Sequence, residues 1–220
     1  KTKADAWIVQ AGSREILEWF SQQPFPSLAL YGRFLDIPVA AAGVMKVPAV
    51  IDALDQLTAY GHSRIVMLSR ESDRLPIPGY AQKVFLEQLE ARGIQAGAYN
   101  LPDWECTPEG LRNILDSLFQ LTPPTALFIT DVLLLFPAYA HLLRHGITAP
   151  EQVSLICSDE RPEYTWCKPA IAHIRWDYYK IVRRILEWAD KTSRGKEDLS
   201  QIFVDAEFYA GGSIGPAPKS

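Results

Sequence analysis

The sequence predicts an α/β fold in which mostly parallel strands are covered by helices. Apolar runs of strand length alternate with amphipathic helical patterns along almost the whole chain, which is typical of repeated β-α-β units. The clearest unit spans residues 124–159, where an apolar run at 126–129, a helical segment ending at His145-Gly146 and a second apolar run at 153–157 follow one another. Strands that are apolar at successive positions indicate a parallel sheet buried on both faces.

The first half of the chain begins with a strand and a helix whose N-cap is Ser13, because a serine hydroxyl can accept a bond from the first helical turn. Apolar residues at helical spacing then predict a helix that ends at Gly61. The expected elements are strands at 7–9, 27–31, 38–43 and 64–68, helices at 13–20, 50–60 and 82–92, and a polar loop at 70–78.

The second half repeats the alternation. Thr107 followed by Pro108 combines an N-cap with a proline in the first turn of a helix. Besides the unit at 124–159, the expected elements are strands at 98–101, 170–175 and 202–208 and helices at 107–120 and 178–192.

Composition indicates an ordinary globular protein. The 220 residues are 48% hydrophobic and 22% charged, enough for one large domain or two small lobes. The net charge of −4 lacks the basic excess of a nucleic-acid-binding surface, so any DNA-contacting part is expected outside this chain. Cys106, Cys157 and Cys167 lack CxxC spacing, which favours reduced thiols over a disulfide framework or a zinc site. The sequence shows neither a membrane-spanning stretch nor an export signal, so we expect a cytoplasmic protein.

Three segments carry a family resemblance. PTALFITD at 124–131, LRHGITAPEQVSLICSDE at 143–160 and KPAIAHIRWD at 168–177 resemble the effector-binding domain of LacI/GalR-type transcriptional regulators, over roughly residues 5–216. The resemblance implies a two-lobed, periplasmic-binding-protein-like fold, each lobe a mostly parallel sheet flanked by helices.

The resemblance also implies how the chain is divided. Residues 1–62 plus 178–200 would form the N-terminal lobe, without its opening β-α-β portion, and residues 63–177 plus 201–220 the C-terminal lobe. In the family a helix-turn-helix head precedes that portion. PxxxLYGR at 26–33 and NLPDWExTPEG at 100–110 also resemble regulators with a GntR-type winged-helix head.

Two carboxylates stand where a ligand is expected. Asp131 and Asp159 each follow an apolar strand, and ligands of open α/β sheets bind beyond the carboxyl ends of the strands. Asp131 could instead serve as a helix N-cap, and Asp159 could cap a helix or pair with Arg161. Thr130 stands where the family often places a ligand-contacting asparagine.

The resemblance implies further ligand contacts. Trp176 would line the cleft between lobes or pack in the core, and Trp104, between charged residues, is expected outside the core and stacked on a ligand. Pro76 replaces the arginine with which sugar-responsive relatives grip hydroxyl groups. Arg70 or Arg74 could substitute for that arginine.

The sequence contains no recognisable catalytic motif. His141 and His145 share one helical face but lack the glutamate of an HExxH motif, so we expect a solvated face and no metal ligand. GxSxG and glycine-rich phosphate loops are absent, and no cofactor is expected.

The preferred interpretation is the effector-sensing and dimerisation domain of a bacterial DNA-binding transcriptional regulator. It would bind a small, sugar-like molecule, form a homodimer and reach operator DNA through a head absent from this chain. The alternative, from a different class, is the solute-binding protein of a transport system.

Overall fold

The computed structural model describes residues 4–219 and divides the chain into two compact units. Unit 1 comprises the described residues up to Met45 together with Trp176–Ala206. Unit 2 comprises Lys46–Arg175 together with the described residues from Glu207 onward. Among residues 4–219, no helix has both the length and the apolar character needed to cross a bilayer.

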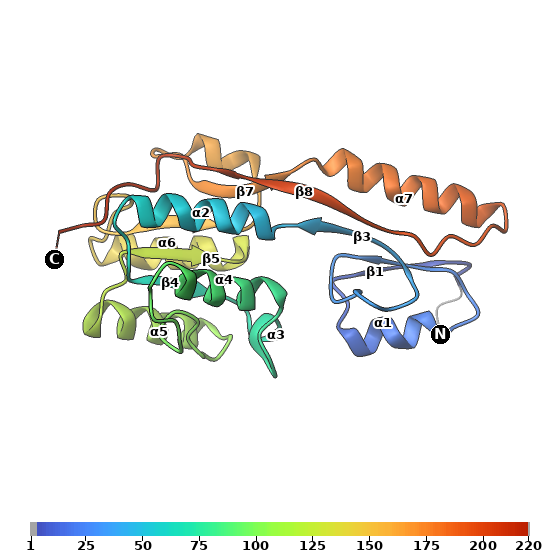
Figure 1. Cartoon of the computed structure of the whole chain (residues 1–220), viewed down its shortest axis with the longest axis horizontal. Coiled ribbons are helices and arrows are strands. Elements are labelled where there is room, and N and C mark those ends of the chain that lie inside the picture. The colour runs from blue at the N-terminus through green and yellow to red at the C-terminus, as the bar shows by residue number, and fades with distance from the viewer. Residues whose placement is uncertain (1–3, 220) are drawn as a thin grey trace. The chain divides into compact units, whose positions relative to one another are not determined.

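Unit 1 contains a parallel sheet with the strand order β1-β2-β3-β8. Helix α1 packs against β2 and helix α7 against β3 (Figure 1). The last residues of β8 belong to unit 2, where Glu207 pairs with Arg175 at 2.8 Å. The elements are β1 (Trp7–Gln10), α1 (Arg14–Ser21), β2 (Ser27–Leu30), β3 (Ala40–Met45), α7 (Tyr178–Ser193) and β8 (Gln201–Tyr209).

Neighbouring side chains of β2 face different helices, as the two-residue period of a strand requires. Ala29 packs with Leu17 of α1, whereas Leu28 packs with Trp188 of α7. Both faces of the sheet are therefore covered by helices. This is the physical reason that the strand is apolar at successive positions.

Unit 2 contains a second parallel sheet, with the order β4-β5-β6-β7. The elements of unit 2 are these four strands and the helices around them (Figure 1). They are α2 (Val47–Ala59), β4 (Ile65–Leu68), α3 (Glu71–Arg74), α4 (Tyr80–Ala91), α5 (Pro108–Leu121), β5 (Ala126–Ile129), α6 (Val132–Arg144), β6 (Ser154–Cys157), the 3-10 helix η1 (Pro162–Trp166) and β7 (Ala172–Trp176).

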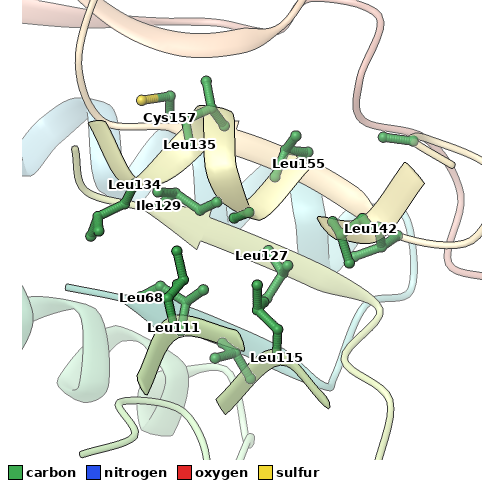
Figure 2. Packing of buried hydrophobic residues seen from close by; sticks show 14 of the residues in the cluster. Leu68, Leu111, Leu115, Leu127, Ile129, Leu134, Leu135, Leu142, Leu155 and Cys157 are labelled. Carbon is green, nitrogen blue, oxygen red and sulfur yellow. The ribbon is translucent and has the colours of Figure 1, made fainter. Parts of the chain in front are cut away.

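The largest core lies between this sheet and helices α5 and α6. Figure 2 shows leucines of both helices meeting the side chains of the central strands. On the other face, Phe85 of α4 packs on Phe128 of β5, with ring centroids 6.1 Å apart. The labelled residues of the core are Leu68, Leu111, Leu115, Leu127, Ile129, Leu134, Leu135, Leu142, Leu155 and Cys157.

Two of the predicted helix starts have the expected caps. The Ser13 hydroxyl accepts a bond from the Ile16 amide, and the Thr107 hydroxyl accepts one from the Gly110 amide at 3.0 Å. Both bonds satisfy amides that have no partner within the helix.

The strand predicted at 98–101 is wrong, because this segment forms a turn. The Asn100 side chain accepts a bond from the Gly97 amide and donates one to the Ile65 carbonyl at 2.9 Å. The Asn100 carbonyl also accepts a bond from the Met67 amide at 2.7 Å. The turn thus satisfies polar groups of β4 that a neighbouring strand would otherwise bond.

The division between units also differs from the predicted lobes. Residues 46–62, predicted in the first lobe, belong to unit 2, and residues 201–206, predicted in the second, belong to unit 1. Helix α2 packs against α4, and the His62 ring lies 2.9 Å from the Gly215 carbonyl. Residues 201–205 pair with β3. Packing partners remote in sequence therefore set these boundaries.

Candidate ligand-binding site

Polar residues follow three neighbouring strands of unit 2 at the same edge of the sheet. Leu68, Ile129 and Cys157 are partners in register, so the residues after them emerge side by side. Adjacent strands lie about 4.8 Å apart. The row consists of Ser69 and Arg70 after β4, Thr130 and Asp131 after β5, and Ser158 and Asp159 after β6.

Asp131 combines two roles in the structure. One carboxylate oxygen caps α6 by accepting the Leu133 amide at 2.6 Å, and the other lies 2.5 Å from Arg70 Nε. The hydrogen bond to Asp131 is the main reason that the pKa of Arg70 is raised. The expected N-cap is therefore confirmed, and the ion pair places a cation beside it.

Asp159 is paired with Lys46, a residue that sequence reasoning missed. Lys46 Nζ donates to Asp159 Oδ1 and to the Ser158 carbonyl, both at 2.8 Å. The side chains of Lys46 and Asp159 are 28% and 32% exposed, so the pair is reachable from solvent. The two partners are 113 positions apart, and no local pattern marks Lys46 as a neighbour of Asp159.

The hydroxyl groups of this row are turned toward the protein. Thr130 Oγ1 donates to the Leu68 carbonyl at 3.3 Å, and Ser158 Oγ donates to the Thr130 carbonyl at 3.0 Å. The Ser69 hydroxyl accepts from the Gln82 side chain at 3.2 Å. Each hydroxyl oxygen keeps accepting capacity. These contacts hold the strand ends in a defined geometry.

The thiol beneath this row is unreactive. Burial raises the pKa of Cys157 to about 11, although the hydrogen bond from Tyr164 opposes that change. A thiol with this pKa is almost wholly protonated at neutral pH, and the thiolate is the nucleophilic form. Cys157 is therefore suited to the core, not to covalent chemistry.

Arg74 lies buried under the loop at 101–107. Its guanidinium pairs with Asp103, donates to the Trp104 carbonyl and lies 5.7 Å from the centre of the Trp104 ring. Desolvation lowers the pKa of Arg74, and the nearby Glu71 carboxylate opposes this effect. Of the two arginines considered as ligand contacts, Arg70 is the more exposed.

The prediction that Trp104 lies outside the core is wrong. Its side chain is 7% exposed and packs in the large core of unit 2. The charged neighbours Asp103 and Glu105 suggested exposure, but the contact with Arg74 turns the indole inward. The tryptophan therefore fixes the loop from beneath.

Trp176 ends β7 and belongs to unit 1, unlike the other predicted contacts. It packs beside the buried residues Ala42, Ile181 and Val204, and its ring lies 5.7 Å from that of Tyr178. It is nevertheless only partly buried. The structure thus gathers Arg70, Thr130, Asp131 and Asp159 at one sheet edge and places Trp176 in the other unit.

Comparison with known proteins identifies the class to which this architecture belongs. The family model described as a periplasmic binding protein-like domain matches residues 54–214, so the chain belongs to this family. The chain is 23% identical over 200 residues to the HTH-type transcriptional repressor CytR of Escherichia coli K12, covering 90% of this chain. It spans 58% of the length of that curated relative.

Solved structures show the same fold. A LacI family transcriptional regulator from Enterococcus faecium, with bound ribose, has a TM-score of 0.79 at 19% identity, over 96% of this chain and 80% of that one. The cellobiose complex of the transcriptional regulator CelR has a TM-score of 0.75 at 17% identity, over 95% and 65%. The predicted resemblance to the effector-binding domain of LacI-type regulators is confirmed.

Proposed function

We propose that this chain is the effector-binding and dimerisation domain of a DNA-binding transcriptional regulator, and that it binds a small, uncharged, hydroxyl-rich molecule. The observation that carries the proposal is the pair of neighbouring, partly exposed ion pairs at the carboxyl ends of β5 and β6. In open α/β sheets this edge is the ordinary position of a ligand site.

The charges of the row favour a neutral ligand. Arg70 and Lys46 balance Asp131 and Asp159, so the row offers donors and acceptors without net charge. A hydroxyl group can both donate to a carboxylate and accept from a cation. Partly exposed ion pairs contribute only up to about 1 kcal/mol each, so ligand hydroxyls can insert between the partners.

The names of the relatives agree with this class of ligand. One solved relative carries ribose and another cellobiose, both rich in hydroxyl groups. Within the row we propose Asp159, Asp131, Thr130 and Arg70 as direct contacts. We assign Arg74 and Trp104 to holding the loop at 101–107. A ligand contact of Trp176, which lies in unit 1, stays a prediction from the family resemblance.

Sensing is favoured over transport and over catalysis. The relatives named above are transcriptional regulators, and the alternative of a transport protein finds no support in them. Catalysis is disfavoured because Ser69 and Ser158 bond to Gln82 and to the Thr130 backbone. Ser154 does contact a histidine, His62, at 3.0 Å, but both side chains are buried. The raised pKa of Cys157 also disfavours its use as a catalytic nucleophile.

We further propose a homodimer that acts in the cytoplasm and reaches operator DNA through a segment outside this chain. The net charge of −4 favours DNA contacts outside this chain, because a DNA-binding surface is usually basic. Three apolar side chains on one side of α6, Leu133, Phe136 and Leu143, are 66%, 53% and 48% exposed. Such an apolar stripe is suited to a subunit contact.

A thermal-shift screen of neutral sugars, sugar acids and nucleosides tests the ligand class. A ligand at a hundred times its Kd stabilises the folded chain by about 2.7 kcal/mol. We expect neutral sugars to raise the Tm, and Asp159→Asn to remove that rise. The matched control is Asp55→Asn elsewhere in unit 2, where Asp55 is 63% exposed and pairs with Arg92.

Two results would contradict the proposal. Equal stabilisation of the Asp159→Asn variant and the control would place the ligand elsewhere. A Tm rise with sugar acids alone would contradict the choice of a neutral ligand.

A further inference from the structure

Helices α5 and α6 bring together one carboxylate and two imidazoles. Asp116 of α5 faces His141 of α6 and His145, the C-cap residue of that helix. The two histidines are four positions apart and lie on one side. Asp116 Oδ1 lies 3.1 Å from His141 Nε2 and 3.9 Å from His145 Nε2. The three possible ligand atoms all lie within 4.8 Å of one another.

The core of unit 2 holds these three side chains in place. Asp116 directly follows Leu115, which is fully buried, and His141 directly precedes Leu142, which is 1% exposed. Both leucines belong to the core between α5, α6 and the sheet (Figure 2). The backbone positions of the cluster are therefore set by packing before any ion binds, which favours a preorganised site.

A hydrogen bond also orients one imidazole. His145 Nδ1 lies 2.8 Å from the His141 carbonyl, and a carbonyl can only accept, so Nδ1 carries the proton. In the neutral ring this leaves the lone pair on Nε2, the atom that faces Asp116. Metal-binding histidines commonly have their second nitrogen fixed by a backbone carbonyl in this way.

The separations suit a small transition-metal ion. Nitrogen and oxygen ligands bind zinc at about 2.0–2.2 Å, so two ligand atoms in tetrahedral geometry lie roughly 3.3–3.6 Å apart. The observed separations of 3.1 Å and 3.9 Å from Asp116 Oδ1 bracket that value. Small rotations of the side chains would bring all three atoms onto one ion.

The surroundings leave room for an ion and for a further ligand. The cluster lines a cavity of about 680 Å³ between α5 and α6. His141 is 12% exposed, whereas Asp116 and His145 are 42% and 53% exposed, so the ion can enter from solvent. Two arginines share the cavity, and one of them, Arg112, is already paired with Glu109. Arg144 is the cation that would oppose binding.

We propose that Asp116, His141 and His145 form a site for a divalent transition-metal ion such as Zn²⁺ or Co²⁺, which joins α5 to α6. Two of the three ligands are imidazoles, which suit these ions, whereas Ca²⁺ and Mg²⁺ take oxygen ligands. The fourth position is open to water. The ion stabilises unit 2 by binding the folded chain more tightly than the unfolded chain.

Titration calorimetry and visible absorption with Co²⁺ test the site, using the 220-residue chain without a histidine tag, freed of metal by a chelator. We expect one ion per chain and the intense absorption of tetrahedral Co²⁺. Asp116→Asn and His145→Asn should each weaken binding more than about tenfold. His145 is exposed, so its variant keeps the core intact, and circular dichroism checks the fold of each variant.

Two matched controls distinguish loss of a metal ligand from a change in the surrounding charge or thiol. Arg144→Gln lies between the two histidines on α6 and removes a charge but no ligand, so binding should stay equal or tighten. Cys106→Ser removes the exposed thiol in the same cavity and should leave binding unchanged. The proposal is overturned if Co²⁺ does not bind, if binding survives both ligand variants, or if Cys106→Ser abolishes it.

Discussion

The buried ion pair between Arg184 and Asp198 is predicted to be essential for the stability of unit 1. Both side chains are only 4% exposed, and they form two hydrogen bonds, at 2.8 Å and 3.1 Å. Lys191 adds a third donor to Asp198 at 2.8 Å. The perturbation is Asp198→Asn, which removes the negative charge and leaves Arg184 buried.

The structure allows the loss to be estimated. Removing one partner of a buried pair costs about 3–5 kcal/mol, because the remaining charge is left without compensation. Arg184 still donates to the Ser200 carbonyl at 2.6 Å, and an asparagine oxygen can still accept, so we expect the low end, about 3 kcal/mol. For a chain of this size that corresponds to a Tm lower by roughly 6–12 °C.

The assay is urea and thermal unfolding followed by circular dichroism and tryptophan fluorescence. The matched control is Asp190→Asn, which makes the same change of charge on α7. Asp190 pairs with Arg194, and their side chains are 56% and 65% exposed. An exposed i,i+4 pair contributes about 0.5 kcal/mol or less, so the control should lower the Tm by no more than roughly 2 °C.

The pH dependence has a defined sign. Burial alone would raise the pKa of Asp198, but hydrogen bonds from Arg184, Lys191 and Ser200 outweigh it, so the pKa is lowered. The stabilisation is therefore present above the unfolded-state value of about 3.9 and is lost as the pH falls below it. If Asp198→Asn destabilised the chain no more than Asp190→Asn, the reasoning would be refuted.

Three further predictions concern other parts of the chain. His62 is 2% exposed and burial lowers its pKa, so the unfolded chain binds a proton at this residue more readily than the folded chain. The free energy of unfolding should therefore decrease as the pH falls from about 7.5 to about 5.5. Urea titrations should show a smaller decrease in His62→Asn, and an unchanged decrease would contradict this. Phe136→Glu on the apolar stripe of α6 should weaken self-association in sedimentation velocity, whereas Leu121→Glu, 80% exposed at the end of α5, should not; equal effects would exclude this stripe as the contact. Thr107→Ala should lower the unfolding free energy by about 1 kcal/mol in urea titration, because the Gly110 amide loses its acceptor, and Thr107→Ser should retain most of it.

Local sequence patterns were sufficient to predict most of the strands and helices. The apolar run at 126–129 coincides with β5, and Asp131 caps α6 as its position after the strand suggests. Burial on both faces is the reason that such runs predict parallel strands. The segment at 98–101 misled because Asn100 forms hydrogen bonds both within its turn and with β4, a role that strand propensity does not reveal.

The candidate site could be predicted only in outline. The aspartates at the strand ends follow from the register of a parallel sheet, but Lys46 reaches Asp159 from 113 positions away. The indole of Trp104 lies against Arg74 and belongs to the same buried cluster as the leucines of α5, although its sequence neighbours are charged. Such contacts depend on which elements pack together, and the local sequence does not predict that packing.

By itself, the sequence determined most of the strands and helices, and the edge of the sheet where polar residues gather. The spacing of apolar residues, the helix-capping residues and the apolar runs of buried strands each involve only a few neighbouring residues, so they are visible in the sequence. Only the tertiary structure decided which charges meet at that edge, where the two units divide, and that Asp116 faces His141 and His145. Those outcomes depend on packing between distant segments, where a few ångströms decide whether an ion pair or a metal site can form.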